Sequence, residues 1–301
     1  MAAAPIEPLD KEDARKTYRY LRIGMIGAVV LLAVSIAIER SKVDCWQTSI
    51  SAYYYTPVRA IFVGAMIAVG FSLIVYKGRG WEDVWLNFAG MLAPVVAVAP
   101  TIDLGRCWSV VPNPPPRTAD GSLAEWVVTN IDNNIYALLI AGSIGLLVAF
   151  VTAVWPNRSL RPLVAKDTRS TTLSLVATAG ALVVVWLLIQ NWGDFDTRAH
   201  GYAALLMFVF LILAIGANVF HHRRESQDGN ERKKKWFMRY TVVGVLMVMG
   251  GILIPTTRVF GEHTTLWLEG YEIVLFAVYW IAQTVENWNE AVPVQTEAAG
   301  S

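Results

Sequence analysis

Arg59 is the first side chain in this 301-residue sequence whose chemistry stands out against its surroundings. It follows a run of tyrosines that includes Tyr54 and Tyr55, in the segment SISAYYYTPVRAIFVG, and it precedes an apolar stretch. Thr56 and Pro57 predict a helix start, because threonine caps helices and proline is favoured in their first turn. The helix dipole repels a cation there, so we expect Arg59 to have a partner of opposite charge. Its guanidinium could bind a phosphate or a carboxylate.

Carboxylates that could be this partner open the last apolar segment, WLEGYEIVLFAVYWIAQTVENW. A helical spacing of three and four residues places the following side chains on one stripe: Glu269, Glu272, Phe276, Tyr279, Gln283 and Glu286. An ionised carboxylate that faces lipid is costly. The stripe is therefore expected to face the interior of a helix bundle or a wet cavity.

Further polar side chains precede another apolar segment. The stretch NWGDFDTRAHGY supplies Asp194, Asp196, Arg198 and His200, and Asp103 follows the third apolar run. Aspartate and histidine are acceptable metal ligands. The chain has only four histidines and no HExxH pattern, so we expect no metal and no cofactor.

The composition indicates the elements that must position these residues. Hydrophobic residues make up 55% of the chain and charged residues 16%, whereas soluble domains carry about 25% charged residues. Runs of about 20 apolar residues can cross a bilayer as helices. We predict an all-α, polytopic membrane helix bundle over 17–285, between tails at 1–16 and 286–301. Its eight predicted spans are 17–38, 57–76, 84–101, 135–155, 171–190, 199–220, 239–256 and 264–285.

The basic residues predict the orientation of the bundle. With eight spans and a cytoplasmic N-terminus, 18 of the 25 lysines and arginines lie on the inner side, as the positive-inside rule requires. Both termini are therefore expected in the cytoplasm. The third span contains Pro94 and Pro100, and a re-entrant segment is the alternative there.

Cys45 and Cys107 follow the first and the third span, so this topology places both on the outer side. Thiols are oxidised in such compartments, and we predict a disulfide between them. Two unrelated thiols are the alternative.

Small residues at intervals of four predict helix-packing surfaces in three spans. They are Ala60, Gly64 and Ala68 in the second span, Ala89, Ala93 and Ala97 in the third, and Ala141, Gly145, Ala149 and Ala153 in the fourth. We expect these three spans to be mutual neighbours.

Three features together resemble a family of uncharacterised bacterial multi-pass integral membrane proteins. They are SISAYYYTPVRAIFVG, LNFAGMLAPVVAVAPT, and a final helix that carries Glu272 and Gln283. The likeness extends from the first span to the last. It implies a multi-pass protein of a bacterial plasma membrane, and it implies no particular activity.

The favoured functional hypothesis is binding or transport of a lipid-like or small polar ligand in an outer polar vestibule. We expect an anionic or zwitterionic amphiphile, membrane lipids as partners and no nucleic acid, with tyrosines rimming a wet entrance. The candidate ligand-binding residues are Arg59, Tyr54, Tyr55, Asp103, Asp194, Asp196, Arg198, His200, Glu269 and Glu272.

Two other classes stay open. One is an intramembrane metal-dependent hydrolase, although an enzyme is the less favoured reading. The other is a structural or assembly protein of the membrane without a small ligand. A retinal-binding photoreceptor is excluded because no predicted span contains a lysine. No Cys-x-x-Cys pair is present, which argues against a disulfide-exchanging enzyme.

Overall fold

The computed structural model describes residues 11–99, 101, 107, 117–120, 122–154, 176, 178–180, 183, 186, 195–226, 231–257 and 259–289. This part of the chain is helical apart from turns and one isolated bridge between Arg117 and Leu123. The long helices are α1 (Lys11–Val43), α2 (Arg59–Val75), α3 (Trp81–Val98), α4 (Glu125–Val154), α6 (Phe195–Ser226), α7 (Glu231–Thr257) and α8 (Thr264–Glu286). Two short 3-10 helices, η1 (Ser51–Tyr55) and η3 (Gly261–His263), precede α2 and α8.

Five described helices are long and apolar enough to cross a membrane, within α1, α4, α6, α7 and α8. Large apolar side chains such as Leu205, Phe220 and Val242 face outward from α6 and α7. Such a surface suits a lipid environment better than water. The described residues therefore support a multi-pass membrane protein built as a helix bundle.

Seven of the eight predicted spans coincide with described helices, with ends that differ by several residues. The fifth, 171–190, lies mostly outside the described residues, and the few described residues in it are helical. Most of the two predicted tails also lies outside the described residues, although α1 already begins at Lys11.

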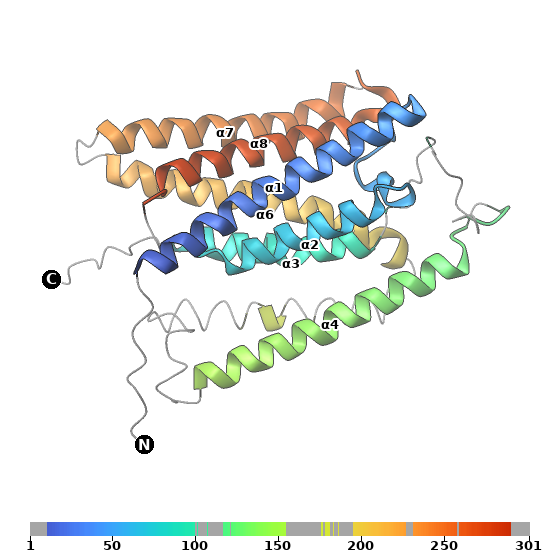
Figure 1. Cartoon of the computed structure of the whole chain (residues 1–301), viewed down its shortest axis with the longest axis horizontal. Helices are drawn as coiled ribbons and strands as arrows, with labels where there is room; N and C mark the ends of the chain where they lie inside the picture. Colours follow the sequence, from blue (N-terminus) through green and yellow to red (C-terminus); the bar gives the residue numbers. More distant parts are fainter. Residues whose placement is uncertain are drawn as a thin grey trace.

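Helices α1, α2, α3, α6, α7 and α8 form the bundle in Figure 1, and α4 lies along one side of it against α3 and α6. Helix α3 packs on α2 and α6, α7 on α6 and α8, and α1 on α2 and α8. We call the end that holds Cys45, Cys107, η1 and Glu269 the disulfide end. The opposite end, which holds Arg22, Glu82, His222, Lys233 and Glu286, is called the basic end.

The backbones of α2 and α3 touch at two glycines. A Cβ atom built on Gly90 would lie 2.6 Å from the carbonyl oxygen of Gly70, and one built on Gly70 would lie 2.7 Å from that of Gly90. Ala89, Ala93 and Ala97 of α3 are fully buried, so the predicted packing surface of the third span is confirmed.

The predicted packing surface of the second span is wrong, because Ala60, Gly64 and Ala68 are all exposed. The face of α2 that packs is rotated away from them and includes Phe62, Ala65 and Gly70. Ala141 and Gly145 of α4 are exposed as well. A periodic row of small residues therefore did not suffice to tell which face of a helix meets a neighbour.

Candidate functional site

The segment SAYYY forms the short helix η1 inside the disulfide end of the bundle. Tyr53, Tyr54 and Tyr55 are all buried, so the prediction that they rim a wet entrance is wrong. Side chains satisfy the irregular backbone here, because Ser49 Oγ accepts the Ala52 N–H at 3.0 Å and Thr56 Oγ1 accepts the Val58 N–H at 3.2 Å. Such local bonds allow a segment that lacks the regular α-helical hydrogen bonds to lie inside a membrane bundle when protein surrounds it.

The loop before η1 is fixed by covalent and polar contacts. Cys45 and Cys107, the pair predicted from the sequence, are joined by a disulfide with their Cα atoms 5.8 Å apart. The side-chain amide of Gln47 bonds to the backbone of Cys107. The carbonyl of Thr48 accepts the N–H of Leu266 at 2.9 Å, which ties the loop to the first turn of α8.

Glu269 connects η1 to α8. Its carboxylate accepts the Ile50 N–H at 2.6 Å and lies 3.5 Å from Ser51 Oγ. This glutamate was predicted to face the bundle interior, and it does.

A cavity of about 70 Å³ lies beside η1, between α1, α2, α3, α6 and α8. Apolar side chains such as Leu32, Phe62 and Met207 form most of its lining. Among the described residues, Ser51 and Glu269 are the polar side chains that line it. The cavity has room for roughly five water-sized groups.

Arg59 lies against Tyr54, outside the cavity. Its Nη2 lies 2.6 Å from the hydroxyl oxygen of Tyr54, and its guanidinium lies 4.2 Å from the centre of the Tyr54 ring. Arg59 is exposed and does not line the cavity. The expectation of a carboxylate partner is replaced by an aromatic one, since a guanidinium binds an aromatic face favourably.

Glu272 is 3% exposed, and neither carboxylate oxygen has a hydrogen-bond partner among the described residues. It lies against α7 at Gly251, where an added Cβ atom would be 3.7 Å from Glu272 Oε1. Glu269 and Glu272 therefore face different neighbours. The prediction of one site shared by Arg59 and Glu272 is not supported, because the contacts found for Arg59 are with Tyr54.

The remaining candidates lie near the start of α6 or outside the described part of the chain. His200 is buried, and its Nδ1 bonds to the carbonyl of Ala99 at 2.7 Å, which joins α6 to the end of α3. Arg198 is exposed. Asp103, Asp194 and the side chain of Asp196 lie outside the described residues. The hydroxyl of Tyr55 donates to the carbonyl of Thr101 at 3.0 Å.

No group of three or more histidine, cysteine or acidic side chains that could hold a metal ion occurs within the described part of the chain. The described geometry therefore gives no support to the metal-dependent hydrolase alternative.

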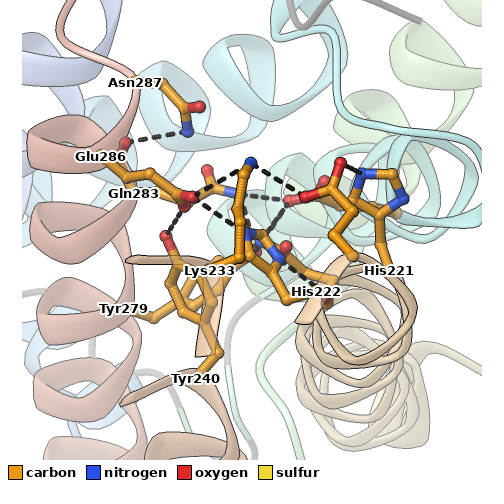
Figure 2. A network of polar contacts seen from close by, with 11 residues as sticks. His221, His222, Lys233, Tyr240, Tyr279, Gln283, Glu286 and Asn287 are labelled. Carbon is orange, nitrogen blue, oxygen red and sulfur yellow. Dashed lines mark hydrogen bonds and ion pairs between the residues drawn. The ribbon is translucent and has the colours of Figure 1, made fainter. Parts of the chain in front are cut away.

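The basic end contains a polar network that the sequence reading missed (Figure 2). Glu82 Oε1 accepts the Tyr279 hydroxyl at 2.7 Å and the Asn218 amide at 3.3 Å, and it also accepts the Gln283 amide. These side chains come from α3, α6 and α8, and all of them are buried. The stripe predicted on the last span pointed to Tyr279 and Gln283, whereas nothing near Glu82 in the sequence indicated burial.

A second part of this network surrounds Glu286. Its Oε1 lies 2.8 Å from His222 Nε2 and 4.0 Å from Lys233 Nζ, and its Oε2 accepts the Tyr240 hydroxyl at 2.6 Å. Lys233 also pairs with the partly exposed Glu225, whose Oε2 lies 2.9 Å from Lys233 Nζ. The stripe predicted on the last apolar segment included Glu286, but nothing in the sequence pattern predicted His222 and Lys233 as its neighbours.

Two arginines of α1 hold the end of α8. Arg22 Nη1 donates to the carbonyl of Asn287 at 2.8 Å, and Arg19 Nε donates to that of Trp288 at 2.7 Å. Cations are favourable at helix C-termini, where carbonyl groups lack partners. Arg22 is fully buried and lies over the ring of Tyr76.

The two ends thus differ in kind: an apolar cavity with one carboxylate at the disulfide end, and a closed polar network at the basic end.

Comparisons of the chain with protein-family models, curated proteins and solved structures found no match, so the family resemblance seen in SISAYYYTPVRAIFVG stays a prediction.

Proposed function

We propose that this chain is a multi-pass protein of a bacterial plasma membrane that binds a small amphiphile in the cavity at its disulfide end. The observation that carries this proposal is the cavity itself, an apolar space with the Glu269 carboxylate in its lining. Ligand pockets are typically apolar with a few well-placed polar groups.

The lining favours one class of head group. Glu269 accepts hydrogen bonds and carries negative charge when ionised, whereas Arg59 lies outside the cavity. A carboxylate in an apolar surrounding gains most from a cationic partner. We therefore favour an amphiphile with an ammonium group, alone or in a zwitterion, over the purely anionic ligand expected when Arg59 was taken as the contact.

Binding is favoured over transport by the closed basic end. The network around Glu82 and Glu286 joins α3, α6, α7 and α8 there. A transported ligand would have to break these bonds to leave at that end.

The proposal includes the orientation of the bundle in the membrane. A disulfide persists in oxidising surroundings, and basic residues favour the cytoplasmic side. The disulfide end would therefore face outside, with both termini in the cytoplasm and eight spans in all.

The test uses two probes with the same four-carbon chain, butylamine and butanoate, which match the size of the cavity and are added to purified protein in detergent. Wild type should bind the amine at least about tenfold more tightly, which corresponds to about 1.4 kcal/mol. Glu269→Gln should lose this preference, because the neutral amide attracts an ammonium group less. Glu262→Gln, which removes an exposed charge at the same end, should keep it.

Equal binding of the two probes to wild type and to Glu269→Gln would refute the proposal. A structural role for Glu269 gives a third pattern, in which Glu269→Gln lowers the unfolding temperature and neither probe binds to wild type. That pattern would favour the structural or assembly alternative.

A further inference from the structure

His222 and Glu286 meet in the basic-end network in a way that defines the position of a proton. His222 is on α6 and Glu286 on α8, and the distance between His222 Nε2 and Glu286 Oε1 is 2.8 Å (Figure 2). His222 Nδ1 lies 2.9 Å from the backbone carbonyl oxygen of Asn218. A carbonyl oxygen can only accept, so Nδ1 must carry a hydrogen.

With the hydrogen on Nδ1, a neutral His222 has only a lone pair at Nε2. An ionised Glu286 would present a second lone pair to it at 2.8 Å, which is repulsive. The contact is favourable only when one more proton lies between the two atoms. That proton makes the pair either an imidazolium with a carboxylate or a neutral imidazole with a carboxylic acid, and the total charge is the same in both cases.

We propose that His222 and Glu286 form a proton-binding site that joins the ends of α6 and α8. The Tyr240 hydroxyl of α7 completes it by donating to Glu286 Oε2 at 2.6 Å. Loss of the proton leaves one net negative charge on two buried groups and removes the attraction between the helices. The bound proton is therefore a ligand that holds the basic end closed.

The site has a route to solvent. His222 and Glu286 have side chains that are 2% and 6% exposed, whereas the side chains of His221, Glu225 and Lys233 are 34%, 29% and 26% exposed. His221 lies 3.1 Å from Glu225, Glu225 lies 2.9 Å from Lys233, and Lys233 lies 4.0 Å from Glu286. Titratable groups thus lead from the surface to the buried pair, and the proton can exchange with the solution.

Other charged groups surround the site from neighbouring elements. Arg79, in the turn before α3, is close enough to His221 and Glu225 to interact with them electrostatically. Glu82 of α3 interacts in the same way with Tyr240. Arg22 of α1 is turned to the carbonyl of Asn287. None of these groups supplies a hydrogen to the contact between His222 Nε2 and Glu286 Oε1.

The test compares the unfolding temperature of detergent-solubilised wild type and variants at about pH 6 and about pH 9, below and above the ordinary histidine pKa of about 6.5. The contact between His222 Nε2 and Glu286 Oε1 needs this proton, and the unfolded chain has no such contact. Stability from this proton is therefore present at the lower pH and lost as the pH rises. Between the lower and the higher pH, the unfolding temperature of wild type should fall by about 2–4 °C more than that of Glu286→Gln, because the glutamine amide donates to His222 Nε2 and does not titrate in this pH range.

Glu231→Gln is the matched control, since it removes an exposed carboxylate at the same end. Its unfolding temperature should change with pH by the same amount as that of wild type. Parallel pH dependence of wild type and Glu286→Gln would overturn the proposal.

A second measurement covers the case in which Glu286→Gln does not fold. His222→Gln should also remove the pH dependence, because its amide can donate to an ionised Glu286. In wild type, nitrogen NMR of labelled histidines should show Nε2 of His222 sharing a proton at about pH 6 and releasing it at high pH. A free Nε2 lone pair at about pH 6 would contradict the inference. This inference does not depend on the proposed ligand of the cavity.

Discussion

Glu269 and Glu272 show how strongly the surroundings of a single residue determine what it can do. They lie three residues apart on α8, and both were expected to face the interior. Glu269 accepts hydrogen bonds from Ile50 and Ser51 and lines a cavity, whereas Glu272 is buried against α7 without a bonding partner among the described residues. A buried carboxyl group without hydrogen-bond partners lowers the stability of the fold. A buried carboxyl group that has donors and faces a cavity can contact a ligand there.

Replacement of the two glutamates by methionine should therefore have opposite effects. Glu272→Met should raise the free energy of unfolding by roughly 1–3 kcal/mol, because it removes an unpaired polar group from the interior. Glu269→Met should lower it by a similar amount, because the Ile50 N–H loses its acceptor. Thermal unfolding in detergent measures both. Destabilisation by Glu272→Met as well would mean that Glu272 has a stabilising partner.

At the scale of elements, the packing of α2 on α3 depends on two glycines that let the backbones approach, and not on a row of small residues in α2. Gly70 and Gly90 allow α2 and α3 to touch, although neither belongs to the rows with a spacing of four residues. Gly64 belongs to such a row, and an added Cβ atom there meets nothing within 4 Å. A helix presents several faces with small residues, and the neighbours decide which one is used.

Gly90→Ala should lower stability by roughly 1–3 kcal/mol, because its methyl group would meet the backbone oxygen of Gly70 and the helices would have to separate. Gly64→Ala adds the same methyl group on an open face of α2. It should change stability by less than about 0.5 kcal/mol. Comparison of the two unfolding temperatures checks this, and equal losses would contradict the observed packing.

At the scale of the whole molecule, the two ends have different chemistry. One end holds a disulfide, a buried 3-10 helix and an apolar cavity, and the other is closed by charged side chains and holds the arginines that cap α8. An oxidising compartment suits the first end and the cytoplasm suits the second.

Reporter fusions test this orientation. A fusion after residue 120 should report the outside of the cell and one after residue 230 the inside. Mass spectrometry of non-reduced peptides should recover Cys45 linked to Cys107. A fusion after residue 230 that reports the outside would reverse the proposed orientation and place the disulfide in a reducing compartment.

The sequence by itself determined the helical architecture, the cysteine pair as a candidate bridge and the inward stripe of α8. These depend on local properties, namely the length of apolar runs and the helical repeat. Phe276, Tyr279 and Gln283 of that stripe are buried as expected.

Only the tertiary structure decided which polar groups meet. The burial of η1, the cavity beside Glu269 and the network at the basic end depend on side chains far apart in the chain. Glu286 meets His222 across 64 residues, Gln283 meets Glu82 across 201, and Arg22 meets the carbonyl of Asn287 across 265. A local pattern shows that a carboxylate must be sheltered, but the donor that shelters it comes from whichever helix packs beside it.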